Sequence, residues 1–350
     1  TLVTGGMPVP GTEVGGGALV KLPPTRAVDM YFRQLVDEHD QPVDDAWRGM
    51  RRDRLLAVWQ ECRPHVLMFE LFPFGRRQMR FELLPLLEAA SAAAERPVIV
   101  CSVRDILVAQ DKPERNQEML EITRRYFDHV LIHGDPALIG FDHTFPLAKG
   151  FGVRRHETGE GGDERASLPA ADGAGAGEVV VSAGGGDVGE ILLSTAIAAR
   201  PLTSLRDKPW RVLVGASVPG PEFEALQKLA TPGIAVQRAR PDFPSLLPRC
   251  LLSISQGGYN TMMEVIQAGC RAVAVPYAGG SETEQTLRGK LLIERGGIHV
   301  LPESALSPTA LARTIEQAMA APPARTGGID TNGAEVSAGL IRRLADAVPW

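Results

Sequence analysis

Apolar residues in the first half of the chain follow two alternating patterns: short continuous runs, and longer segments in which they recur every three or four positions. The continuous runs predict strands at 65–70, 97–103 and 129–133, and the periodic segments between them predict helices at 78–95 and 114–127. Strands that are apolar throughout and separated by helices are typical of a parallel sheet covered on both faces. The sequence therefore predicts an α/β unit in this half.

The same alternation resumes at Val179 and continues almost to the end of the chain. Continuous apolar runs predict strands at 179–181, 212–214, 234–236, 251–254, 272–275 and 299–301. Helices are predicted at 190–199, 221–230, 261–268 and 335–347. A further helix is expected to begin at Ser307 and Pro308, because serine is a preferred N-cap and proline fits the first helical turn. The chain thus contains two similar α/β units.

The composition changes between the two units. Residues 157–178 are rich in Gly, Ala and Asp and contain almost no large apolar residue, which is typical of an exposed linker. We therefore expect an N-terminal domain at 1–156, the linker at 157–178, a second domain at 179–334 and a C-terminal helix at 335–350. Residues 2–6 resemble the end of a strand followed by a glycine turn, so an earlier piece is expected to be missing from this sequence.

Composition also excludes several classes of protein. Hydrophobic residues make up 44% and charged residues 23% of the 350 positions, which allows two ordinary cores and excludes wholesale disorder. The net charge of −5 argues against a nucleic-acid-binding surface, which needs clustered Lys and Arg. The four cysteines have no CxxC spacing, which indicates reduced core thiols rather than a disulfide or zinc framework. No apolar run approaches the roughly 18 residues of a membrane span, so we expect a cytoplasmic protein.

A glycine-rich turn opens the second unit. A strand runs into Gly184, Gly185 and Gly186, and a helix follows Gly189, so backbone N–H groups there can face an anion. The spacing matches the dinucleotide fingerprint, but the next strand ends at Val214 with no acid for a ribose, which argues against a nicotinamide enzyme. The chain also lacks the GK[ST] sequence of P-loop NTPases. A phosphate-facing loop and a purely structural turn both remain open.

The most specific stretch is SQGGYNTMME at 255–264. Gly257 and Gly258 let a ligand approach the backbone between a strand and a helix predicted to begin at about Thr261. Polar side chains that suit a diphosphate collect at this helix N-terminus: Ser255, Gln256, Asn260 and Thr261. Glu264 lies one turn on, where a carboxylate can accept both hydroxyls of a ribose. Thr261 and Glu264 equally have the spacing of a capping box, so both interpretations of Glu264 are open.

This stretch, followed by Ala268-Gly269 and by Val-Ala-Val-Pro at 273–276, resembles the donor-binding half of GT-B glycosyltransferases, and family 28 most closely. Over nearly its whole length the chain is similar to a bacterial group of predicted glycosyltransferases, with matches at 72–77 and 101–105. The resemblance implies the α/β GT-B fold, in which two Rossmann-like, doubly wound domains face a cleft. It also implies inverting, metal-independent transfer from a nucleotide-sugar to an acceptor hydroxyl, with UDP as the expected nucleotide and no cofactor.

The resemblance also implies roles for individual donor-side residues. Glu264 corresponds to the carboxylate that holds the donor ribose, and the turns at 184–186 and 255–261 to the diphosphate cradle. Glu282 and Gln285 resemble the acid and amide that hold the donor sugar, although a solvated helix start is the alternative for Glu282.

Arg240 lies near the position where relatives hold the nucleotide base. Two departures qualify the resemblance. Gln256 stands where many relatives of other GT-B families carry a histidine. The N-terminal loop with Gly-His, which lies beside the acceptor in similar enzymes, is absent from this sequence.

The acceptor side offers fewer signals. An inverting transfer needs a base near the acceptor hydroxyl, and the candidates at predicted strand ends are Asp105 and Glu70, followed by Asp135. For each, pairing with a neighbouring arginine is the structural alternative. His129 and His133 share a predicted strand and are expected to point the same way without close partners, and no metal cluster is expected.

Aromatic residues precede basic ones at 69–80, with Phe69, Phe72 and Phe74 followed by Arg76, Arg77 and Arg80. Such a segment can seat a lipid-linked or anionic acceptor at a membrane surface, or its rings can simply be core. The acceptor is therefore unknown, either lipid-linked or another small molecule. Two rival functions stay open beside the transferase: a nucleotide-sugar epimerase or hydrolase of the same fold, and a non-catalytic nucleotide-binding partner.

Overall fold

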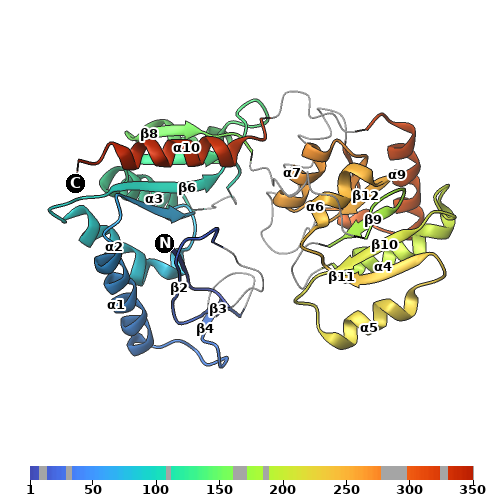
Figure 1. Ribbon diagram of the computed structural model, residues 1–350, viewed down its shortest axis with the longest axis horizontal. Coiled ribbons are helices and arrows are strands. Elements are labelled where there is room, and N and C mark those ends of the chain that lie inside the picture. The colour runs from blue at the N-terminus through green and yellow to red at the C-terminus, as the bar shows by residue number, and fades with distance from the viewer. Residues whose placement is uncertain are drawn as a thin grey trace. The chain divides into compact units, whose positions relative to one another are not determined.

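The computed structural model describes residues 1–7, 14–28, 34–107, 112–160, 172–183, 189–276, 298–323 and 330–349, coloured along the chain in Figure 1. The chain divides into two compact units. Unit 1 consists of Thr1–His133, Phe145–Glu157 and Glu335–Trp350, and unit 2 consists of Gly134–Thr144 and Thr158–Ala334.

The described residues of unit 2 form a six-stranded sheet in the order β11-β10-β9-β12-β13-β14, and every neighbouring pair is parallel. The strands are β9 (Val179–Ser182), β10 (Trp210–Val214), β11 (Ile234–Arg238), β12 (Leu252–Ser255), β13 (Ala272–Ala274) and β14 (Ile298–Val300). All six predicted strands of this unit are present. The order is that of a doubly wound dinucleotide-binding sheet, in which the winding reverses between β9 and β12.

Helices cover both faces of this sheet (Figure 1). On one face, Val179 and Val181 pack against α4 (Glu190–Ala199), α5 (Gly220–Leu229) and α9 (Pro308–Ala320). On the other, Val180 packs with Leu246 of α6 (Phe243–Leu246), and β13 packs with α7 (Tyr259–Ala268). Short 3-10 turns lie at η2 (Phe141–His143), η5 (Arg200–Leu202), η6 (Leu247–Arg249) and η7 (Glu303–Ala305). Ser307 caps α9 as predicted, because its side chain accepts the N–H of Ala310.

The described residues of unit 1 form a four-stranded parallel sheet in the order β5-β6-β7-β8. These strands are β5 (Val66–Glu70), β6 (Val98–Arg104), β7 (His129–His133) and β8 (Arg154–Glu157). Two small sheets pair β1 (Leu2–Thr4) in parallel with β2 (Leu19–Lys21), and β3 (Arg26–Ala27) antiparallel to β4 (Leu35–Val36). Strand β8 escapes prediction because this edge strand reads Arg-Arg-His-Glu and contains no apolar run.

The helices of unit 1 are α1 (Asp45–Cys62), α2 (Arg80–Ser91) preceded by η1 (Arg77–Met79), α3 (Pro113–Tyr126), η3 (Pro146–Gly150) and α10 (Gly333–Asp346). The C-terminal helix α10 packs Leu340 against Val100 of β6 and Leu131 of β7 (Figure 1). Helix α1 is not predicted from the hydrophobic pattern, because polar and charged residues interrupt its apolar positions.

Two expectations about the chain between the units are wrong. The segment 134–144, expected in the N-terminal domain, belongs to unit 2, where Leu138 is in the core beside α7. The described ends of the expected exposed linker are exposed only in part: Asp172 and Gly173 are exposed, but Thr158 is buried, and Ala174 is buried against Val180 and Leu246. The small residues serve close packing, since a Cβ at Gly175 would overlap the backbone of Leu246.

The cysteines are free, as expected, but they are not all in the core. Cys101 and Cys270 are buried, Cys250 is half-buried and Cys62 is exposed at the end of α1. The prediction of core thiols is therefore wrong for Cys62.

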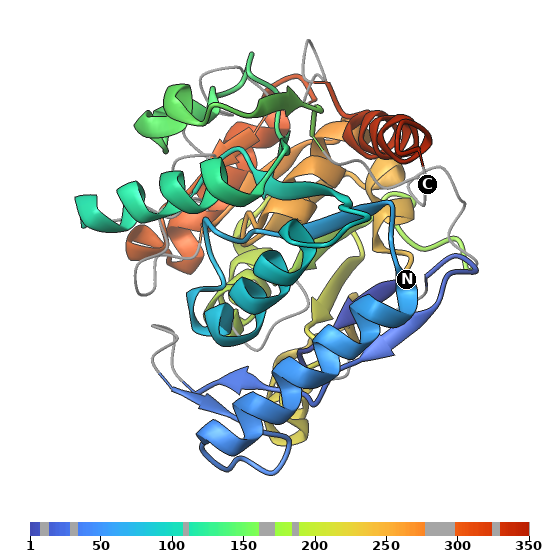
Figure 2. The same cartoon turned by 90° about the vertical axis from the view of Figure 1, so that its left-hand side faces the viewer.

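A buried arginine joins the N-terminal strands of unit 1 to its helices. Arg51 of α1 is 3% exposed, and its Nε and Nη2 donate to the carboxylate of Glu82 in α2 at 2.6 and 3.1 Å. Its Nη1 donates to the carbonyl oxygens of Gly5 and Pro23, which flank the β1–β2 pair beside α1 (Figure 2). One guanidinium thus holds three segments distant in the sequence.

We expect Arg51→Leu to lower the free energy of unfolding by about 3–5 kcal/mol, because Glu82 is left as an unpaired buried carboxylate. The matched control is Arg52→Leu. Arg52 is half-buried on the same helix and, within the described part of the chain, forms its ion pair with exposed Asp53, so a change within about 0.5 kcal/mol is expected. Urea unfolding measures both variants. A loss below about 1 kcal/mol for Arg51→Leu would show that the buried pair does not hold the unit together.

Candidate functional site

The two central strands of unit 2 end side by side. Ser182 at the end of β9 is in register with Ser255 at the end of β12, and the winding of the sheet reverses between these two strands. Helix α4 follows β9 with Gly189 as its N-cap, and α7 follows β12 with Gly258 as its N-cap. Both helix N-termini therefore lie at the carboxyl edge of the sheet, where open α/β sheets bind ligands and where helix N–H groups favour anions.

Glycine is required where α4 begins. Gly189 has φ +119°, and a Cβ there would overlap the Cβ of Ala183 and lie 3.2 Å from the side chain of Gln256. Gln256 is buried in the β12–α7 turn, and its side-chain amide lies close to the start of α4. Close packing therefore requires glycine at position 189. Gly184, Gly185 and Gly186 lie outside the described residues, as do Glu282 and Gln285.

The β12–α7 turn brings together the polar residues singled out in the sequence. Ser255 is buried, and its Oγ accepts the N–H of Gly257. The positive φ of 72° at position 257 favours glycine there. Asn260 is exposed and Thr261 is half-buried in the first turn of α7. The turn thus offers backbone, hydroxyl and amide groups at a helix N-terminus.

The helix begins two residues before the predicted start, which removes one of the two interpretations of Glu264. With Gly258 as the N-cap, Thr261 is the third residue of α7 and no side chain caps the helix. The capping-box interpretation of Thr261 and Glu264 is therefore wrong. Glu264 is half-buried in the second turn of α7, at the same end of the helix as the β12–α7 turn.

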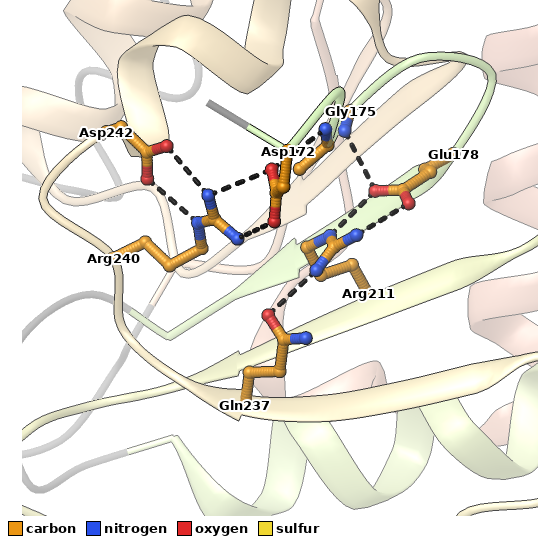
Figure 3. Close-up of polar contacts among 8 residues, drawn as sticks. Asp172, Gly175, Glu178, Arg211, Gln237, Arg240 and Asp242 are labelled. Atoms are coloured by element: carbon orange, nitrogen blue, oxygen red, sulfur yellow. Dashed lines mark hydrogen bonds and ion pairs between the residues drawn. The ribbon is translucent and has the colours of Figure 1, made fainter. Parts of the chain in front are cut away.

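Arg240 lies in a network of carboxylates after β11 (Figure 3). Its Nη1 and Nη2 donate to Asp172 at 2.7 and 3.1 Å, and its Nε and Nη2 donate to Asp242, both at 2.8 Å. Hydrogen bonds from Arg240 hold the pKa of each aspartate below its ordinary value. Pairing with two carboxylates favours a structural role for Arg240 over the predicted contact with the nucleotide base.

A second arginine fixes the same segment. Arg211 of β10 donates Nε and Nη2 to Glu178, both at 2.7 Å, and Nη1 to Gln237 of β11 at 2.7 Å (Figure 3). Glu178 also accepts the N–H of Gly175 at 2.9 Å, and its hydrogen bonds with Arg211 lower its pKa. The segment 172–178 is thus held to β10 directly and to the turn after β11 through Arg240.

The three carboxylates predicted as candidate general bases have different surroundings. Glu70 is exposed at the end of β5 and pairs with Arg76 at 3.0 Å, which is the structural alternative foreseen for it. Asp105 is buried after β6, and its Oδ1 accepts the N–H of Ile106 at 2.8 Å. Asp135 belongs to unit 2, and its two oxygens accept the N–H groups of Ala137 and Asp330.

The expectation that His129 and His133 have no close partners is wrong. His129 Nδ1 lies 2.8 Å from Nε2 of His156 in β8, and the two rings stack. His133 Nε2 lies 2.7 Å from Oγ of Ser102 in β6. Both contacts join residues of adjacent strands that are far apart in the chain, so local sequence carries no signal for them.

The aromatic residues of the 69–80 segment are core, as the structural alternative expected. Phe69, Phe72 and Phe74 are all buried, and Phe74 packs against Phe145 and Phe151. These three rings are therefore not a membrane-facing surface. None of the helices in the part of the chain that the structure describes is long and apolar enough to cross a membrane.

Residues 189–335, which include β12, α7 and the start of α4 but not β9, match the glycosyltransferase family 28 C-terminal domain. Two similar curated proteins are UDP-N-acetylglucosamine–N-acetylmuramyl-(pentapeptide) pyrophosphoryl-undecaprenol N-acetylglucosamine transferases. The one from Rhodospirillum centenum is 30% identical over 107 residues, 31% of this chain and 28% of the relative. The one from Brucella anthropi is 30% identical over 171 residues, 47% of this chain and 45% of the relative. The chain thus matches less than half the length of these relatives.

Solved structures of glycosyltransferases share the fold. The calicheamicin glycosyltransferase CalG4 superposes with a TM-score of 0.56 at 14% identity, covering 95% of this chain and 87% of that one. MurG of Acinetobacter baumannii superposes with a TM-score of 0.54 at 17% identity, covering 88% and 83%. The predicted GT-B fold, with two α/β units built on parallel sheets, is therefore confirmed.

We expect Gly189→Ala to destabilise the protein, by about 1–3 kcal/mol from the left-handed backbone alone, with a further cost from overlap with Ala183. Gly258→Ala is the matched control, because that position has an ordinary φ of −59° and open space around its Cα. Urea unfolding of both variants measures the difference. Equal stabilities would show that the two turns do not approach as closely as the structure has them.

We expect Arg240→Gln to lower the urea midpoint at pH 7, with a difference from the wild type that shrinks as the pH falls below about 4. The ion pairs lower the pKa values of Asp172 and Asp242 in the folded state. Their contribution is therefore present above the ordinary aspartate pKa and is lost as pH falls through the folded-state values. Arg206→Gln, which removes an exposed pair with Asp207, is the control. A difference that does not vary between pH 7 and pH 3 would contradict the role of the ion pairs.

Proposed function

We propose that this chain, a family 28-like GT-B glycosyltransferase by its C-terminal domain and its fold, transfers a sugar from a UDP-sugar to an acceptor hydroxyl. The observation that carries the proposal is the convergence of two helix N-termini at the carboxyl ends of β9 and β12. Helix N-termini favour a multiply charged anion, and both of these lie in the part of the chain that matches the family domain.

The donor's diphosphate would lie against the N-termini of α4 and α7, beside Ser255 and Gln256 of the turn. Negative charge grows on the diphosphate as its bond to the sugar breaks, and preoriented N–H groups stabilise that charge without reorganising. In the proposal this arrangement takes the role that a metal ion has in other glycosyltransferases. Inversion of the sugar configuration follows from direct attack by the acceptor.

Glu264 would hold the ribose. It is a half-buried carboxylate that does not cap α7, so its position one turn inside the helix suits a ligand. A carboxylate accepts hydrogen bonds from both hydroxyls of a ribose at once, and charge-assisted hydrogen bonds of this kind are stronger than neutral ones. Asn260 and Thr261 in the first turn supply further polar groups toward the diphosphate.

The names of the similar curated proteins guide the choice of substrates. They name UDP-N-acetylglucosamine as donor and an N-acetylmuramyl-pentapeptide diphosphate on undecaprenol as acceptor. By analogy we propose a UDP-sugar donor and, as the acceptor class, a lipid-linked sugar diphosphate.

We expect calorimetric titration to show selective binding of UDP over ADP and GDP. Glu264→Ala is expected to weaken UDP binding by about 1.5–3 kcal/mol, because it removes charge-assisted hydrogen bonds to the ribose. The control is Glu224→Ala, which removes an exposed carboxylate from α5 and leaves binding unchanged.

Each other outcome identifies a rival. A lower melting temperature for Glu264→Ala with unchanged UDP affinity assigns the residue a structural role. Turnover of a UDP-sugar without any acceptor favours a hydrolase or epimerase. Binding of UDP without any turnover favours a non-catalytic partner, and no binding of any nucleotide overturns the proposed function.

A further inference from the structure

The carboxyl edge of the unit 1 sheet holds a serine–histidine pair on adjacent strands. Ser102 lies within β6 and His133 is the last residue of β7, and Oγ of Ser102 is 2.7 Å from Nε2 of His133. Both side chains are half-buried, so they are partly desolvated without being sealed from solvent. This is the edge at which open α/β sheets bind their ligands.

The loop that follows β5 is strained beside this pair. Leu71 and Arg76 both have left-handed backbones, with φ of 65° and 55°, although neither is a glycine. The N–H of Leu71 donates to the carbonyl of Ser102 at 2.7 Å, which fixes the strained loop to the serine. Left-handed conformations of ordinary residues cost free energy and gather at functional sites, because the surrounding structure has to hold them.

The electrostatic surroundings suit a proton acceptor. Burial, with a further contribution from Arg104, lowers the pKa of His133 below its ordinary value, so the imidazole is neutral at pH 7 and can accept a proton. Asp105 acts in the opposite direction and favours the protonated ring. Asp105 is anchored close by, because its N–H donates to the carbonyl of His133 at 3.2 Å. Its charge would stabilise the imidazolium that forms when His133 takes a proton.

The predicted carboxylate bases are less suited to this role. The exposed carboxylate of Glu70 is paired with Arg76. Asp105 is buried, with one carboxylate oxygen accepting the N–H of Ile106. Asp135 uses both oxygens for backbone N–H groups in unit 2. Among the described strand ends of unit 1, the Ser102–His133 pair therefore combines a neutral, half-buried base with a partner that orients it.

We propose that His133 is the general base on the acceptor side and that Ser102 orients its ring. This inference rests on the proposed function. In the step, the acceptor O–H bond breaks and its proton passes to a ring nitrogen of His133. The acceptor oxygen forms a bond to the anomeric carbon of the donor sugar, and the bond from that carbon to the diphosphate breaks, with its electron pair leaving on the UDP oxygen. Asp105 acts as a positioning residue through its charge.

The first arm of the test needs no substrate. Diethyl pyrocarbonate acylates accessible, unprotonated imidazoles, and peptide mass spectrometry can follow each of the seven histidines of the chain. We expect His133 to be acylated in the folded protein, with a labelling midpoint at lower pH than that of N-acetylhistidine. An unreactive His133 in folded protein would overturn the proposal, because a ring closed to this reagent is closed to an acceptor hydroxyl.

The second arm measures UDP release from UDP-N-acetylglucosamine. The acceptors are water and an N-acetylmuramyl-pentapeptide diphosphate carrying a short prenyl chain. His133→Gln keeps a hydrogen-bonding group beside Ser102 but cannot act as the base, so we expect kcat to fall by about 10²–10⁴-fold. UDP affinity should stay within about twofold. Ser102→Thr, which keeps the hydroxyl, should retain much more activity than Ser102→Ala.

The outcomes separate this inference from the proposed function. If UDP binds and is released by the wild type, but His133→Gln retains kcat within about threefold, the base assignment fails and the transferase stands. If UDP does not bind, or no turnover occurs with either acceptor, the proposed function fails and the base assignment fails with it. Labelling of Ser102 by a fluorophosphonate would also overturn the proposal, because it would make the serine a nucleophile rather than an orienting group.

Discussion

The reversal of winding between β9 and β12 is the constraint on which the rest of unit 2 depends. Because β10 and β11 lie on one side of β9 and β13 and β14 lie beyond β12, the connections after β9 and β12 leave toward opposite faces. Helices α4 and α7 therefore follow neighbouring strands on opposite faces of the sheet, the arrangement at which open α/β sheets bind ligands. The glycine at position 189 agrees with this arrangement, since a Cβ there would lie 3.2 Å from the side chain of Gln256.

At this sheet, the arginines that hold segments together are distinct from the groups proposed to bind a ligand. Arginine side chains are the obvious partners for a diphosphate, yet Arg211 and Arg240 both pair with carboxylates of the same unit. They hold the incoming segment 172–178 and the turn after β11 in place. In the proposed function, helix N-termini and neutral polar side chains attract the anion, and they are oriented before a ligand arrives.

Much of the fold could be predicted because buried parallel strands leave continuous apolar runs. The strands of both sheets were found in this way except β8, whose sequence of two arginines, a histidine and a glutamate suits an exposed edge. Helix α1 was missed for a related reason, since Arg51 occupies a buried position that a periodicity rule expects to be apolar. In both places a charged residue occupies a position where the hydrophobic pattern expects an apolar one, and only tertiary contacts explain it.

The site was less predictable, because its chemistry depends on which residues meet. Spacing alone does not show whether Glu264 caps the helix or binds a ligand. The helix starts at Tyr259 with Gly258 as its N-cap, which excludes the capping box. For Arg240, the first carboxylate partner lies 68 residues away in the chain. Ser102 and His133 are 31 residues apart and meet only because β6 and β7 pair. The role proposed for His133 therefore depends on a contact between neighbouring strands, which the local sequence does not reveal.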